Sequence, residues 1–247
     1  MRLWGSLAFV ISSALTGVLV THFSSHAILV LLCVGCGAMI GGMMLRPAVM
    51  PAGTEKQAQH AGWTQWKQML SENAVWRFLL CVTLMQGAHA AYYGFSAIYW
   101  QEAGYSSGTV GYLWSLGVVA EIVIFAASNR LFRRWSASDL LLLSCISALI
   151  RWSIMASSTE LGWLIAAQLL HCGSFTLCHL AAMRFIAARD GGEVIRLQSV
   201  YSALAMGGGI ALMTMVCGVL FQHLQGGVFW VMALLVVPVL FLRPKVS

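Results

Sequence analysis

Three ionisable residues, Glu121, Arg151 and His171, each lie inside a long apolar stretch of the sequence. An acid or a base at the centre of a membrane helix costs about 2.5–3.5 kcal/mol, so isolated placement is unfavourable. A charge pair between Glu121 and Arg151 would offset most of that cost. Because the three residues fall on successive apolar stretches, we expect them to meet in a polar cavity. The alternatives are a structural ion pair that locks the bundle and, for His171 alone, a core histidine with satisfied hydrogen bonds.

These residue types suit the handling of an organic anion and a proton. A guanidinium holds a planar carboxylate through two parallel hydrogen bonds, so Arg151 is a candidate anchor for an anionic substrate. Glu121 could alternate between pairing with Arg151 and carrying a proton, and we take Glu121 and His171 as the candidate proton-coupling residues. One proton moving inward gains roughly 2.3 kcal/mol per 100 mV of membrane potential, which suffices to drive uptake of a weak acid.

A stripe of aromatic and hydrogen-bonding side chains precedes the first of these residues. Intervals of three and four residues place the stripe on one helix face. Its members are Gln86, His89, Tyr93, Ser96 and Trp100. Such a face suits a planar apolar substrate with one polar end. For Trp100 and its neighbour Tyr99, we favour the alternative that they belong to the aromatic belt at the membrane surface.

Two further faces carry the same mixture of side chains. Trp114 and Gly117 lie within two helical turns before Glu121, and Gln168 and Phe175 flank His171. We therefore predict one substrate site, built around the guanidinium from several helices. Its candidate residues are Arg151, Gln86, His89, Tyr93 and Trp114.

The elements that must position these residues are membrane-spanning helices. The chain is 60% hydrophobic and 9% charged, whereas charged residues make up about 25% of a soluble domain. A span needs about 20 apolar residues, and the sequence predicts about eight, in an all-α polytopic membrane protein. The predicted ranges are 3–22, 26–45, 75–100, 108–129, 138–157, 161–184, 196–222 and 226–242.

The basic residues follow the positive-inside rule. Of the fourteen Lys and Arg residues, all except Arg151 fall at or near every second junction between spans. The intervening junctions, around 22–26, 101–107, 157–160 and 223–225, hold none. This pattern predicts a cytoplasmic C-terminus, and it leaves no basic patch to bind nucleic acid.

Cysteine and histidine spacing gives little support for other chemistry. Cys33 and Cys36 have redox spacing, but they lie in a Gly- and Ala-rich span, where small residues allow close helix packing. We predict no metal site and no cofactor. An intramembrane enzyme using His89, His171 or His179 remains an alternative without a metal-ligand pair or a nucleophile–base spacing to support it.

An internal repeat organises the chain. Residues 17–23 match 218–224, and residues 45–49 match 242–246, so the first two spans look like copies of the last two. Chance similarity between apolar helices is the alternative. The polar stretch 47–73 reads as a cytoplasmic interdomain loop ending in a short interfacial helix, in which Trp63, Trp66, Met69 and Leu70 recur at helical spacing.

The repeat divides the chain into unequal parts. Residues 1–46 would be the last two spans of one half, and 74–247 the complete six-span second half. Because parallel halves of six spans are the plan of major facilitator transporters, we expect four further spans before Met1. An internal start, a shortened gene and a cut chain are alternative origins. We expect a monomer, or a chain that needs those four spans.

Longer runs then carry a specific resemblance. Residues 86–101 and 111–121, with 2–6 and 179–184, resemble the 3-phenylpropionate transporters of the major facilitator superfamily, which are related to the lactose permease group. The resemblance implies proton-linked uptake of phenylpropionate and cinnamate by a twelve-span protein. Glu121, Arg151 and His171 would match ionisable residues of lactose permease, but Ser174 stands where that permease has a Glu. Residues 128–134 resemble a basic gating loop of the superfamily, with a purely topological role as the alternative.

Two interpretations of the function follow from these patterns. The first is a proton-coupled symporter for an aromatic monocarboxylate such as 3-phenylpropionate. The second is a truncated remnant that inserts in the membrane without transporting, because alternating access needs two halves around a midplane site.

Overall fold

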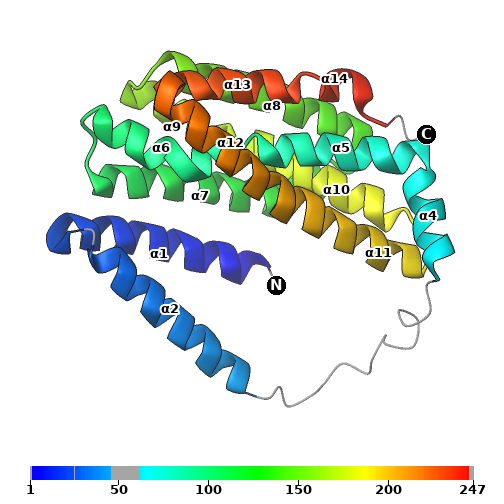
Figure 1. Cartoon of the computed structure of the whole chain (residues 1–247), viewed down its shortest axis with the longest axis horizontal. Coiled ribbons are helices and arrows are strands. Elements are labelled where there is room, and N and C mark those ends of the chain that lie inside the picture. Colours follow the sequence, from blue (N-terminus) through cyan, green and yellow to red (C-terminus); the bar gives the residue numbers. More distant parts are fainter. Residues whose placement is uncertain (1, 25, 46–61, 245–247) are drawn as a thin grey trace.

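The computed structural model describes residues 2–24, 26–45 and 62–244, which form helices joined by short connections (Figure 1). No strand occurs in these three segments, as expected for an all-α protein. Each of the eight ranges predicted as spans is helical. Four of them are single helices: α1 (Arg2–Phe23), α2 (His26–Met44), α7 (Ser107–Leu131) and α8 (Ala137–Ser157).

The other four ranges contain a turn or a change of helix type. They consist of α5 (Asn73–Gly87) with α6 (Ala90–Glu102); α9 (Leu161–Leu169) with η1 (Cys172–Thr176) and α10 (Leu177–Ala187); α11 (Gly192–Tyr201) with η2 (Ser202–Gly208) and α12 (Gly209–Leu224); and η3 (Gln225–Gly227) with α13 (Val228–Val236) and α14 (Val239–Leu242). Within the described residues, four helical stretches are long and apolar enough to cross a membrane by length and composition: 107–131, 137–157, 161–187 and 192–242.

Two of these interruptions shape the interior of the bundle. Between α5 and α6, the peptide N–H of His89 donates to the carbonyl of Gln86, so the helix turns more tightly there. Shortly after the end of α9, the chain forms the π-helical turn η1. Such turns are frequent at functional sites. Gly173 allows this turn to pack on α8, because a Cβ there would lie 2.5 Å from Ser147 Oγ.

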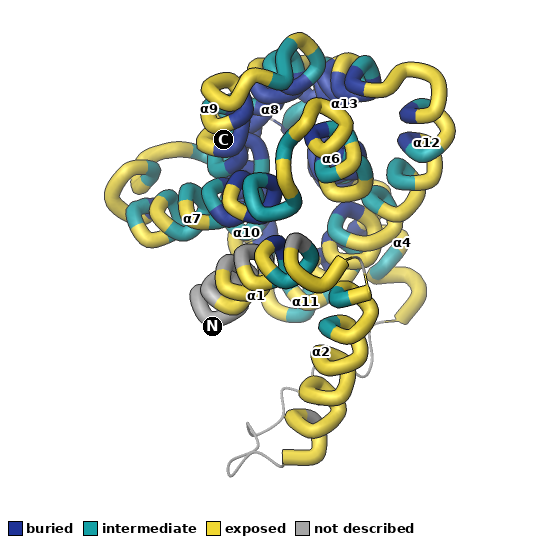
Figure 2. Tube along the Cα trace, turned by 90° about the vertical axis from the view of Figure 1, so that its left-hand side faces the viewer, coloured by how far each residue is buried: buried dark blue, intermediate teal, exposed yellow. Residues whose placement is uncertain are grey.

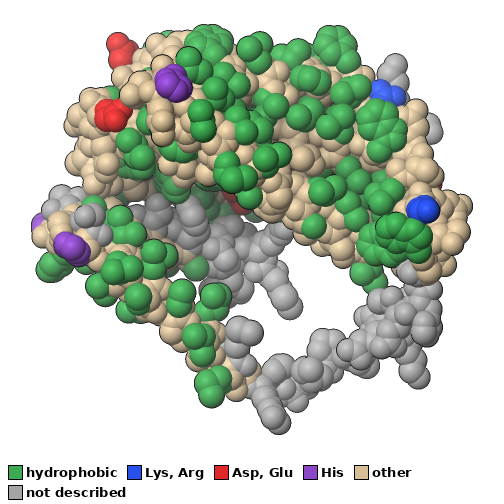
Figure 3. Space-filling model, in the orientation of Figure 1, with side chains coloured by type: hydrophobic (Ala, Val, Ile, Leu, Met, Phe, Trp, Pro, Cys, Tyr) green, Lys and Arg blue, Asp and Glu red, His purple; other side chains and the backbone are tan. Residues whose placement is uncertain are grey.

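The helices from α5 onward form one bundle with a closely packed interior. Figure 2 shows the buried residues on the inner sides of α6, α8, α10 and α13. Stacked aromatic pairs hold these helices together. Phe78 of α5 lies on Phe185 of α10 with ring centroids 4.1 Å apart, and Trp152 of α8 lies on Phe229 of α13 at 6.1 Å. Many large hydrophobic side chains are exposed, and on the face shown in Figure 3 they are spread over the bundle with few charged side chains among them, as expected for a face that meets lipid.

The basic junctions contact one another at one end of the bundle. Arg77, at the start of α5, donates through Nε to the carbonyl of Leu242 at the end of α14, 2.8 Å away. Arg184 donates to a backbone carbonyl in the α7–α8 connection. Arg189, after α10, forms an ion pair of 2.5 Å with Glu72, just before α5. These contacts place the ends of α5, α7, α10 and α14 together, at the right in Figure 1.

The first two helices differ in how they meet this bundle. α1 runs along α7, and Gly17 permits the close approach, since a Cβ there would lie 2.9 Å from the carbonyl oxygen of Ser107. α2 slopes away from the bundle in Figure 1, and most of its described residues are coloured as exposed in Figure 2.

The predicted interdomain segment is described only in part. Residues 46–61 lie outside the described segments, but α4 (Trp63–Ser71) is the short helix that the spacing predicted. Met69 of α4 is buried and Trp63 is exposed. The division of the chain into two unequal halves stays a prediction.

Candidate functional site

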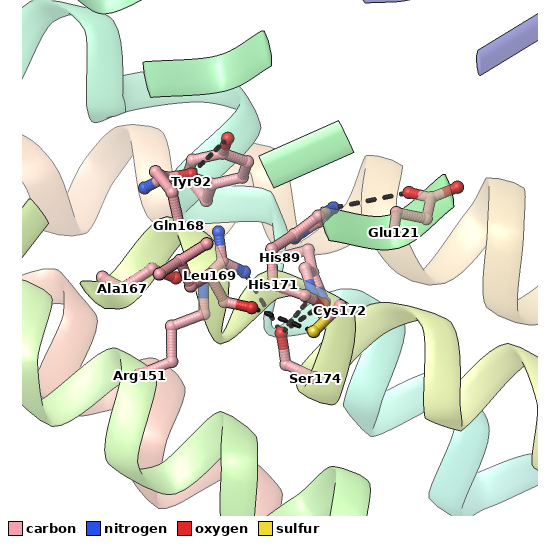
Figure 4. A network of polar contacts seen from close by, with 10 residues as sticks. All are labelled: His89, Tyr92, Glu121, Arg151, Ala167, Gln168, Leu169, His171, Cys172 and Ser174. Carbon is pink, nitrogen blue, oxygen red and sulfur yellow. Dashed lines mark hydrogen bonds and ion pairs between the residues drawn. The ribbon is translucent and has the colours of Figure 1, made fainter. Parts of the chain in front are cut away.

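The guanidinium of Arg151 lies at the centre of a buried polar cluster, drawn in Figure 4. Arg151 is fully buried on α8. Its Nε donates to the carbonyl of Ala167 at 2.9 Å, and its Nη1 donates to Ser174 Oγ at 3.3 Å. The rings of Tyr92 and Trp152 cover it, each 4.4 Å from the guanidinium carbon to the ring centroid. Nη2 has no hydrogen-bond partner among the described residues, so this cation can still donate to an incoming acceptor.

The acid of the cluster pairs with the imidazole. Glu121 of α7 places Oε2 3.7 Å from Nε2 of His171, which directly precedes η1. The predicted pair between Glu121 and Arg151 is therefore not the arrangement found. The physical reason is that Nε and Nη1 of the guanidinium already donate to the Ala167 carbonyl and the Ser174 hydroxyl. Glu121 lies on the far side of the His171 ring.

His89 joins the cluster from the break between α5 and α6. Its Nδ1 lies 2.9 Å from the carbonyl oxygen of Met85, and its Nε2 lies 3.3 Å from Ser174 Oγ. The ring contacts that of His171 edge-on, with centroids 5.7 Å apart. His89 lies one helical turn after Met85 and Gln86, which are also buried, so its imidazole points into the bundle.

Aromatic rings close one side of the cluster. Tyr92 donates through its hydroxyl to Gln168 Oε1 at 2.9 Å, and its ring lies 5.3 Å from those of both Tyr93 and Trp114. The indole N–H of Trp114 donates to Ser96 Oγ at 3.2 Å. Tyr93 is more exposed than Tyr92, so it lies at the edge of the site.

The predicted stripe on α5 and α6 is only partly assembled around the guanidinium. His89 and Tyr93 contact each other and the cluster. Gln86 is fully buried, and both of its amide atoms lack a hydrogen-bond partner among the described residues. Trp100 is fully buried in the core, 6.2 Å from the ring of Tyr92, so its assignment to a surface aromatic belt is wrong. Tyr99 is half-buried against Phe229.

Sequence reasoning missed three residues that complete the site. Tyr92 and Trp152 stack on Arg151, and Ser174 bonds to Arg151 and His89. The signal for Trp152 was its position directly after the arginine. Ser174 was noticed only as a departure from a related pattern, although its place three residues after His171 gives it the same helix face.

A cavity of about 360 Å³ adjoins the aromatic side of the cluster. It lies between α1 and the pair α6–α7, and Trp114 separates it from Tyr92. Its polar lining is neutral, from hydroxyl and amide groups such as those of Ser12, Thr16 and Gln101. An apolar molecule with a hydrogen-bonding end could reach the cluster from this side.

Comparison with known proteins places this architecture in a family. The family model described as "MFS_1 like family" matches residues 1–232, almost the whole chain. The chain belongs to this family. The sequence predicted membership of the major facilitator superfamily and an all-α polytopic membrane fold, and both are thereby confirmed.

This member of the MFS_1 like family is similar to a protein of Escherichia coli (strain K12) named "Probable 3-phenylpropionic acid transporter". The two sequences are 63% identical over 246 residues. The match covers 100% of the present chain and 64% of that protein. The chain therefore spans less than two thirds of the length of the relative that it matches.

Proposed function

We propose that this chain carries the substrate and proton site of a membrane symporter that takes up an aromatic monocarboxylate, such as 3-phenylpropionate, with a proton. The observation that carries the proposal is a fully buried guanidinium whose hydrogen bonds to described residues go to a carbonyl and a hydroxyl, with no described partner for Nη2. A buried cation is costly unless a partner compensates it. A carboxylate brought by the substrate would be that partner, and the name of the similar protein supports this substrate class.

The lining of the site fits the two ends of such a molecule. The carboxylate would accept from Arg151 Nη2, and a proton on His89 would place a second positive charge near it. The aromatic ring would lie against Tyr93 and Trp114, where stacking and edge-to-face contacts contribute about 0.5–1.5 kcal/mol each beyond area burial. Both amide atoms of Gln86 lack a hydrogen-bond partner in the described part of the chain, so they could bind polar substituents of the substrate.

Proton coupling would involve Glu121 and His171. Their 3.7 Å separation allows one proton to be shared between the carboxylate and the imidazole. A change of that proton alters the charge beside the guanidinium, which lies on the other side of the His171 ring. Anion binding and protonation would then favour each other, as symport requires.

The orientation and setting follow from the charge pattern. The basic residues gather at the end of the bundle that holds the last residues of α14. By the positive-inside rule this end would face the cytoplasm of a bacterium, with the chain crossing the inner membrane several times. Its partners would be lipid, a small aromatic carboxylate and a proton, without nucleic acid, and the chain would act as a monomer.

The alternative is that the chain inserts and binds but does not transport. It spans 64% of its relative, and alternating access works by moving one half of a transporter against the other. Such a chain would bind the anion at the same residues while giving no net uptake.

The test is uptake of radiolabelled 3-phenylpropionate by cells that express this chain and lack other carriers for the acid. Accumulation that a protonophore abolishes, and that Arg151→Ala removes at equal membrane abundance, would support the symporter. Lys67→Ala, at an exposed position on α4 and outside the cluster, is the control for removal of a positive charge and should leave uptake unchanged.

Binding without uptake, measured on the purified chain, would favour the alternative. Absence of both binding and uptake would contradict the proposed substrate. Chemical conversion of the acid would instead favour an enzyme.

A further inference from the structure

The hydroxyl of Ser174 is shared by three groups. Ser174 is fully buried on η1, and its Oγ lies 3.3 Å from His89 Nε2, 3.3 Å from Arg151 Nη1 and 3.3 Å from the carbonyl oxygen of His171. The guanidinium can only donate and the carbonyl can only accept. A serine hydroxyl has one proton, so the direction in which it points depends on the state of His89.

The backbone fixes which nitrogen of His89 is free to change. Nδ1 lies 2.9 Å from the carbonyl oxygen of Met85. Because a carbonyl only accepts, Nδ1 must carry the proton in the neutral ring, and Nε2 is then a bare acceptor. In that state Ser174 donates to Nε2. When Nε2 takes a second proton it becomes a donor, and the hydroxyl proton of Ser174 turns to the carbonyl of His171.

In both states the hydroxyl proton of Ser174 has an acceptor, which is Nε2 when His89 is neutral and the His171 carbonyl when it is protonated, and Arg151 donates to Oγ in each. Charge decides between them. Among the described residues, the charged or titratable side chains around the imidazole are Arg151 from α8, His171 before η1 and Tyr93 from α6. The only one of these with a fixed positive charge is Arg151, which repels a second cation on His89. A carboxylate bound to Arg151 would cancel that repulsion.

We infer that His89 takes up a proton when an organic anion binds to Arg151, and that Ser174 is the positioning residue that links the two events. The inference rests on the proposed anion site and assigns to His89, instead of the Glu121–His171 pair, the proton that is taken up when the anion binds. The proton comes from water and forms an N–H bond at Nε2. No bond of the anion breaks and nothing is oxidised or reduced. By linkage, a proton on His89 must strengthen anion binding by the same factor.

The experiment is calorimetric titration of the purified full chain with 3-phenylpropionate between pH 6 and 8, in two buffers of different ionisation enthalpy. The wild type should take up close to one proton per anion. Its affinity for the anion should fall as the pH rises, by up to about tenfold per pH unit where coupling is complete. His89→Gln keeps a polar side chain but cannot take the proton, so it should bind with little proton uptake and a flat pH profile.

Ser174→Ala provides a second variant that keeps His89. It removes the acceptor for a protonated Nε2, so proton uptake should fall while anion binding persists. Ser147→Ala is the matched control, because that hydroxyl bonds to Leu143 of its own helix beside the same π-helical turn. It should behave as the wild type. Thermal unfolding of each variant shows which of them fold.

The outcomes separate the two proposals. The inference is overturned if proton uptake is unchanged in both His89→Gln and Ser174→Ala. In that case, a loss of proton uptake in His171→Gln would place the proton on Glu121 and His171. Binding without proton uptake by the wild type also overturns it. Absence of binding by the wild type overturns the anion site itself.

Discussion

Replacing Arg151 with lysine tests whether the geometry of the guanidinium, beyond its charge, holds the anion. Two of its three nitrogens are occupied by Ala167 and Ser174, and the third, Nη2, is open. The plane is fixed between the rings of Tyr92 and Trp152. A lysine ammonium is a single point of charge that loses this stacking. It cannot keep the Ala167 contact and present a second donor in the same plane.

The magnitude follows from the contacts that are lost. A hydrogen bond to a charged group contributes about 1.5–3 kcal/mol, and Arg151→Lys retains the charge but loses one such bond to the anion. We expect a loss of about 2 kcal/mol in binding free energy, which weakens the affinity for 3-phenylpropionate roughly 30-fold. The assay is titration of the purified chain, followed by calorimetry or by the fluorescence of the tryptophans that line the site.

A matched lysine substitution separates this effect from general damage. Arg184 donates to a backbone carbonyl at the basic end of the bundle, away from the cluster. Arg184→Lys should leave the affinity unchanged. If Arg151→Lys binds within about twofold of the wild type, which is less than 0.5 kcal/mol, the idea that the geometry of the guanidinium holds the anion is refuted.

Three further changes test the packing around the site. Gly173→Ala should destabilise the chain by about 1–3 kcal/mol through overpacking against Ser147, seen as a lower melting temperature in detergent, and adding Ser147→Gly should restore much of the loss. Gly17→Leu should separate α1 from α7. The measurement is cross-linking between cysteines engineered into the two helices, which should decrease. Arg189→Ala breaks a partly exposed ion pair with Glu72, so thermal unfolding should show a loss of no more than about 1 kcal/mol that shrinks in high salt.

The positions of the helices could be predicted well from hydropathy alone. The range 108–129 was predicted as a span and α7 covers 107–131, and the range 138–157 corresponds to α8 over 137–157. The burial of Arg151 and His171 was also expected, because a charged or polar residue amid an apolar run in a membrane must face protein.

The partners of these residues could not be predicted in the same way. Spacing by three and four assumes a continuous helix, but the chain turns at His89 and widens to a π-helical turn after His171. These local changes bring Tyr92 and Ser174 to the guanidinium and leave Trp100 in the core. Which cation pairs with Glu121 depends on how α7 and α8 sit around α9, and that is a property of packing.

The serine at position 174 has a consequence for how the site meets its anion. A glutamate there would lie within reach of Arg151 and would neutralise the guanidinium from inside the protein, whereas a hydroxyl leaves its charge uncompensated. We therefore expect Ser174→Glu to compete with the substrate carboxylate and to weaken 3-phenylpropionate binding at neutral pH by at least about tenfold, the equivalent of one charge-assisted hydrogen bond. Ser174→Gln has the same size without the charge. If both variants bind equally well in the same titration, the anion does not depend on an uncompensated guanidinium, and the assignment of Arg151 as its anchor fails.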